Sequence, residues 1–87
     1  MDVICFHYAK VLELPYTSEF VGIIDIHDCP HGLRGDVIIE STKNDDRLIL
    51  GTCISKDATA DEICEYCLNL LSNEEYCMDV FSHRFEI

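Results

Sequence analysis

The amino-acid sequence predicts an α+β protein, with a mostly antiparallel sheet of about five strands and one helix packed on it. Two observations carry this prediction. Residues 3–54 contain several segments rich in β-branched and aromatic residues, separated by turn residues, which is typical of strands joined by short connections. Residues 60–72 instead repeat their apolar positions with a period of 3.6. The expected order is β-β-β-β-α-β in a single domain, residues 1–87.

The first two strands are expected at residues 3–12 and 20–27. Between them, Pro15 favours a turn because it lacks a backbone donor and disfavours helix in the residue before it. Alternation in the second strand places Phe20, Gly22, Ile24 and Ile26 on one face. A loop over residues 28–35 should follow.

A hairpin is expected from residues 36–42 and 47–54. With Asn44 and Asp45 at the centre of a tight turn, Ile39 faces Leu50 and Val37 faces Thr52. The apolar face of this hairpin then gathers four side chains: Val37, Ile39, Leu48 and Leu50.

The helix is expected to begin after Thr59, because Thr59-Ala-Asp-Glu62 has the pattern of a capping box. Its apolar stripe contains six residues: Ile63, Cys64, Cys67, Leu68, Leu70 and Leu71. Residues 72–73 should end it, although residues 74–77 could add a further turn. In residues 78–87, Phe81, His83, Phe85 and Ile87 alternate, which predicts a final strand.

The charge of the chain is strongly negative. Seventeen acidic residues against six Lys and Arg give a net charge of −11, and residues 57–79 contain no Lys or Arg. Such a surface repels nucleic acid and attracts basic partners. Polar residues interrupt the apolar segment 3–14, so neither an export signal nor a membrane span is expected, and the sequence favours a cytoplasmic protein, including one made in the host cell of a phage.

The six cysteines raise the question of a metal. Cys64-x-x-Cys67, together with Cys77 and His83, has a spacing compatible with a zinc-stabilised structural or adaptor module. The stretch His27-Asp-Cys29-Pro-His31 offers a second partial set, and it also suggests a cysteine nucleophile at Cys29. Reduced core thiols without any cofactor are the main expectation, because Cys64 and Cys67 fall on the apolar stripe of a helix.

In composition the chain resembles the small acidic α+β inhibitors that phages use against host nucleases, including anti-CRISPR and anti-restriction proteins. The resemblance implies a non-enzymatic protein that imitates nucleic acid and occupies the basic surface of a nucleic-acid-binding enzyme or complex. No sequence motif carries the resemblance. Nine residues are the candidate contacts: Asp57, Asp61, Glu62, Glu65, Tyr66, Glu74, Glu75, Tyr76 and Asp79. The first strand, as an edge, also offers a place for a second copy to pair.

Overall fold

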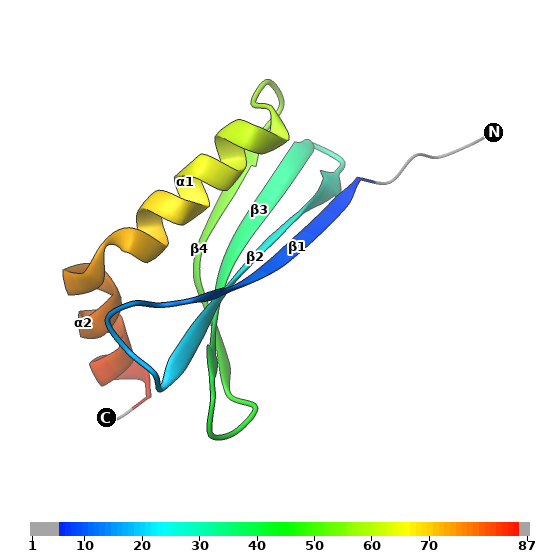
Figure 1. The fold of residues 1–87 in the computed structure, drawn as a ribbon. Helices are drawn as coiled ribbons and strands as arrows, with labels where there is room; N and C mark the ends of the chain where they lie inside the picture. The colour runs from blue at the N-terminus through cyan, green and yellow to red at the C-terminus, as the bar shows by residue number, and fades with distance from the viewer. Residues whose placement is uncertain (1–5, 86–87) are drawn as a thin grey trace.

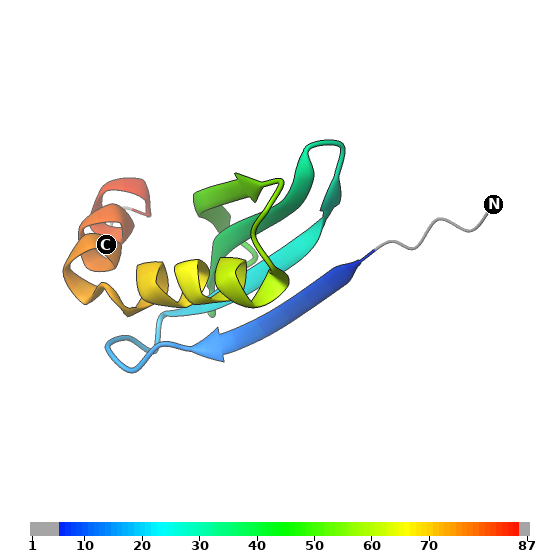
Figure 2. The same cartoon turned by 90° about the horizontal axis from the view of Figure 1, so that it is seen from above.

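The computed structural model describes residues 6–85 and confirms the α+β class. Its elements are β1 (His7–Glu13), β2 (Phe20–Cys29), β3 (Gly32–Ser41), β4 (Arg47–Ser55), α1 (Ala60–Ser72) and α2 (Glu74–Arg84). The strands form one antiparallel sheet in the order β1-β2-β3-β4. In Figures 1 and 2, α1 lies along one side of this twisted sheet and α2 continues from it at one end. None of the helices described is long and apolar enough to cross a membrane.

The core lies between the sheet and the helices. As the alternation in β2 predicted, the side chains of Phe20, Ile24 and Ile26 all face inward. From the other elements the core receives Val37, Ile39, Leu50, Ile63, Cys67, Leu71, Cys77 and Phe81. Helix α1 comes so close to the sheet that a Cβ at Gly35 would lie 2.3 Å from Ile63 Cγ2. These residues fix which side of α1 faces the sheet.

The capping box before α1 is confirmed. The Glu62 backbone N–H donates to the Thr59 hydroxyl at 3.2 Å, and the Thr59 N–H donates to the Glu62 carboxylate at 2.9 Å. The helix then runs to Ser72, as its period predicted. Leu68 departs from the predicted buried stripe, because 41% of its surface is exposed.

The predicted final strand is wrong, because residues 74–84 form α2. The Asn73 side chain caps this helix by accepting from the Tyr76 N–H at 3.2 Å. The apolar residues fit a spacing of four as well as an alternation, and Phe81 and Phe85 pack against Phe20 with ring centroids 4.6 Å and 4.7 Å away. The sheet therefore has four strands, and the layer above it has two helices.

The stretch around His27-Asp-Cys29-Pro-His31 is a hairpin turn, whereas the sequence predicted a loop over residues 28–35. Strand β2 continues to Cys29, β3 begins at Gly32, and these two residues pair directly. Gly32 permits this tight connection because its φ is 122°, a conformation that residues with a Cβ rarely adopt. Of the predicted first strand, residues 6–12 are described, and residues 3–5 lie outside the described part.

The hairpin of β3 and β4 has a different register from the predicted one. Glu40 pairs with Arg47 across a longer connection, because the Thr42 hydroxyl and N–H donate to the β1–β2 connection at Ser18 and Glu19. A bulge at Leu50 then shifts the pairing by one residue. Val37 consequently pairs with Gly51, yet the predicted apolar face is kept.

Candidate protein-binding surface

The helical layer carries all nine predicted contact residues on its outside. Asp57 precedes α1, and every one of the nine side chains is exposed. Four of the acids occupy the first turn of a helix: Asp61, Glu62, Glu74 and Glu75. Negative charge there is stabilised by the helix dipole, so these four have a structural explanation as well as a functional one. Glu62 has the clearest structural role of the four, because its carboxylate also accepts a hydrogen bond from the Thr59 N–H.

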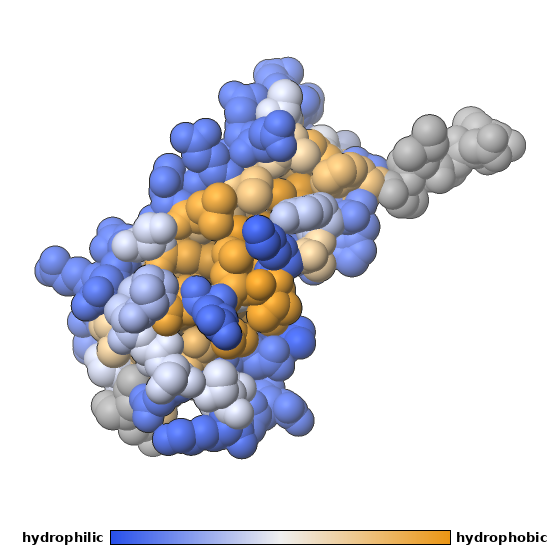
Figure 3. All heavy atoms as spheres, in the orientation of Figure 1, coloured by the Kyte–Doolittle hydropathy of each residue, from blue (hydrophilic) through white to orange (hydrophobic). Residues whose placement is uncertain are grey.

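An exposed apolar strip runs between α1 and β1. Helix α1 packs over β2, β3 and β4, which leaves the helix-facing side of β1 largely uncovered. Phe6 and Tyr8 are each 39% exposed there, and Leu68 of α1 is 41% exposed. With the half-buried Leu12 they form what we call the α1–β1 strip. The exposed Lys10 lies between Tyr8 and Leu12 on the same side, because it pairs with the inward-facing Ile24, so the strip contains one basic side chain. Figure 3 shows a hydrophobic area on this side of the molecule, with hydrophilic groups around it and also lying across it.

Acidic side chains border this strip. Asp61 and Glu65 precede Leu68 by seven and three residues, so all three lie on the same side of α1. At the lower end, Leu12, Leu68 and Leu71 line a groove together with Glu13 and Glu74. Apolar surface of this extent flanked by charge is typical of an interaction site. Sequence reasoning missed the strip because it assigned Leu68 to the core and could not place β1 beside α1.

The other predicted contacts lie away from the strip. A Cβ at Gly51 in β4 would lie 4.0 Å from the Tyr66 hydroxyl, so Tyr66 is on the opposite side of α1 from Leu68. Glu75, Tyr76 and Asp79 line a shallow surface on α2 with Asn73. The nine residues therefore form a broad acidic outer layer. Of these, Asp61 and Glu65 lie on the same side of α1 as the exposed Leu68, and Glu74 lines the groove next to Leu68.

The four residues of the predicted zinc site are not brought together. Cys67 and Cys77 are fully buried in the core, whereas His83 is exposed and its Nδ1 contacts the Asp79 carbonyl oxygen at 2.8 Å. Within residues 6–85, no group of three or more His, Cys, Asp or Glu side chains is arranged to hold a metal ion. Burial raises the pKa of Cys67 to about 11 and also raises that of Cys77. Both thiols therefore stay protonated and weakly nucleophilic at neutral pH.

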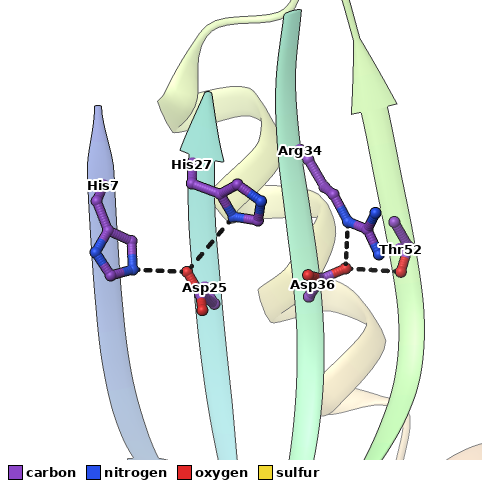
Figure 4. Close-up of polar contacts among 6 residues, drawn as sticks. All are labelled: His7, Asp25, His27, Arg34, Asp36 and Thr52. Atoms are coloured by element: carbon purple, nitrogen blue, oxygen red, sulfur yellow. Dashed lines mark hydrogen bonds and ion pairs between the residues drawn. The ribbon is translucent and has the colours of Figure 1, made fainter. Parts of the chain in front are cut away.

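The histidines near Cys29 contact carboxylates on the side of the sheet away from α1. His7 Nε2 lies 2.9 Å from Asp25 Oδ1, and His27 Nδ1 lies 3.8 Å from the same oxygen (Figure 4). On the neighbouring strand, Asp36 accepts from Arg34 Nε at 3.1 Å and from the Thr52 hydroxyl at 2.8 Å. These contacts give polar partners to Asp25 and Asp36, which are directly paired residues of β2 and β3.

Cys29 itself makes no described hydrogen bond to either histidine of its turn, and it is half-buried at the end of β2. The nucleophile hypothesis needs a base within reach of the thiol, and none of the described contacts supplies one.

Comparison of the chain with protein-family models, curated proteins and solved structures finds no match. Its function must therefore be inferred from its own residues.

Proposed function

We propose that this protein is a non-enzymatic inhibitor that occupies the basic, nucleic-acid-binding surface of a partner such as a bacterial defence nuclease. The observation that carries the proposal is the α1–β1 strip bordered by Asp61, Glu65 and Glu74. Carboxylates on successive turns of a helix repeat about every 5.4 Å, and DNA presents phosphates at a comparably short repeat. Side chains of lysine and arginine that bind phosphates can therefore bind such a helix.

The two parts of the surface act at different stages of binding. The acidic layer has no lysine or arginine in residues 57–79, so it attracts a basic partner over a distance of about 10 Å at moderate salt. The strip then supplies apolar area that becomes buried on contact. Charge of this kind mainly accelerates association and selects the partner, while desolvated apolar side chains contribute most of the affinity.

A displacement assay on double-stranded DNA-cellulose tests the proposal. Proteins of a bacterial lysate are bound to the matrix, and the purified chain is added at increasing concentration to release its partner. The helix variant carries Asp61→Lys and Glu65→Lys. The loop control carries Asp45→Lys and Asp46→Lys, which change the net charge by the same amount in the exposed connection between β3 and β4.

The wild type and the loop control should release the same partner at similar concentrations. The helix variant should require at least about tenfold more protein, equivalent to about 1.4 kcal/mol, because it places like charges against a basic surface. Equal release by both variants would show that net charge alone acts, and the assignment to the helices would be wrong. Failure of the wild type to release any specific protein would refute the inhibitor function.

Leu68→Ala separates apolar contact from electrostatic attraction. Leu68 is substantially exposed, so its truncation should leave the fold intact. We expect weaker partner binding with an unchanged dependence on salt, because no charge is altered. A wild-type affinity for this variant would exclude the strip from the interface.

A further inference from the structure

The side of the sheet that faces away from α1 has a row of apolar side chains across all four strands. Val11 pairs with Ile23, Ile23 with Ile38, and Ile38 with Ile49. Directly paired residues point to the same side of a sheet, so these side chains form one continuous line, which we call the open-face row. Its ends are well exposed, with Val11 at 65% and Ile49 at 54%, whereas Ile38 is half-buried and Ile23 is only 9% exposed.

Charge on this side is mixed, in contrast to the acidic helical layer. Glu13, Asp25, Asp36 and Glu40 point to it, and so do Arg34, Arg47, His7 and His27. Several are already paired, such as Arg47 Nε with Glu40 Oε1 at 3.4 Å. A chain with a net charge of −11 repels a second copy of itself over most of its surface. On this side, however, acidic and basic groups occur together, so two copies can approach with the least repulsion.

We propose that the open-face row binds a second copy of this chain and forms a symmetric dimer of two stacked sheets. This proposal does not depend on the proposed function, because it concerns the opposite side of the molecule. Two faces of this kind stack when the two-fold axis lies between the sheets and parallel to the strands. That axis places β1 of one copy over β4 of the other. Val11 then lies near Ile49 of the second copy, and Glu13 lies near its Arg47. The same axis places Asp25 near Asp36 of the second copy, and the contacts of these carboxylates with His7, Arg34 and Thr52 offset part of their repulsion.

The area of the open face is sufficient for a weak, specific dimer. Four strands about 4.8 Å apart and seven residues long, at about 3.3 Å per residue, give a planar face of about 450 Å². Two such faces together give about 900 Å² before the relief of the side chains is counted, which is the size of weak, transient interfaces. We therefore expect a dissociation constant in the micromolar range.

Sedimentation equilibrium at concentrations well below and well above the expected micromolar dissociation constant tests the dimer. The mass of the wild type should double across this range. Val11→Lys and Ile49→Glu should each remain monomeric, because each buries two charges at the apolar ends of the symmetric interface. Both side chains are exposed in the monomer, so folding should be unaffected, which far-UV circular dichroism checks. Leu68→Glu, which makes the same kind of change on the helical side, should dimerise like the wild type.

Mixing the two variants tests the arrangement. In a mixed pair, one contact brings the introduced lysine of the first variant next to the introduced glutamate of the second, and the other contact keeps the native Val11 and Ile49. An equimolar mixture of Val11→Lys and Ile49→Glu should therefore dimerise although neither variant does so alone. A monomeric wild type at all concentrations would overturn the proposal. Dimers that persist in the single variants would also overturn it, and pairing along the edge of β1 would give that result. A mixture that stays monomeric would overturn it as well.

Discussion

Replacement of Gly35 by alanine tests the contact that positions the acidic helix α1 on the sheet. A Cβ at this position would lie 2.3 Å from Ile63 Cγ2 and 3.4 Å from Cys67 Sγ. Both of these side chains are fully buried, so neither can turn into solvent to make room. Favourable contacts between carbon atoms require about 3.5–4.0 Å, so α1 must move away from β3 by more than an ångström.

The expected cost follows from two opposing effects. Overpacking a tight core destabilises a protein by about 1–3 kcal/mol. Alanine also restricts the unfolded chain more than glycine does, which stabilises the folded state by about 0.4–1 kcal/mol. The middle of the two ranges, about 2 and about 0.7 kcal/mol, leaves a net loss of about 1.3 kcal/mol of unfolding free energy. For a domain of this size, such a loss lowers Tm by about 5–10 °C.

Urea denaturation followed by circular dichroism measures the effect, and two further variants make it specific. Gly51→Ala is the control, because the nearest atom to its Cβ would be Leu70 Cδ2 at 2.8 Å, the end of a flexible side chain that is not fully buried, and the Tyr66 hydroxyl at 4.0 Å is at an ordinary contact distance. It should lie within about 0.5 kcal/mol of the wild type. In a Gly35→Ala/Ile63→Ala double variant, removal of Cγ2 should make the combined loss smaller than the sum of the single losses. A fully stable Gly35→Ala, or strictly additive losses, would refute the reasoning.

Two other predictions concern the helices and their buried thiols. Asn73→Ala removes the acceptor for the Tyr76 N–H and should cost about 1 kcal/mol, measurable as a lower Tm with loss of helical signal. Burial raises the pKa of Cys67 from 9.0 to about 11, so the folded state favours the protonated thiol. Its contribution to stability is complete below pH 9 and should be lost as pH rises toward 11, and Cys67→Ala should flatten that part of the curve of unfolding free energy against pH.

The sequence predicted the local features of this fold better than the pairings between distant segments. The capping box at Thr59 and the inward face of β2 depend on neighbouring residues, and both were predicted correctly. The register of β3 and β4 was wrong, since Thr42 bonds to the distant β1–β2 connection and Leu50 forms a bulge. Neither effect has a signal within the hairpin itself.

The final segment shows how an apolar pattern can fit two structures. Phe81 and Phe85 are compatible both with an alternating strand and with one side of a helix. The signal for a helix was Asn73, an N-cap residue directly followed by acidic Glu74 and Glu75. The same limit applies to the candidate site: acidic residues were identifiable from composition, whereas the α1–β1 strip depends on which strand α1 leaves uncovered.

The distribution of charge gives the two sides of the sheet opposite responses to salt. Attraction between the acidic helical layer and the proposed basic partner would be screened by salt, so that this association should weaken. The proposed dimer is opposed by repulsion between two chains of net charge −11, and screening reduces that repulsion while the apolar open-face row is unaffected. Because the two surfaces lie on opposite sides of the sheet, a dimer would present both acidic layers outward, and Glu13 at the edge of β1 would be the one residue that both proposed contacts share.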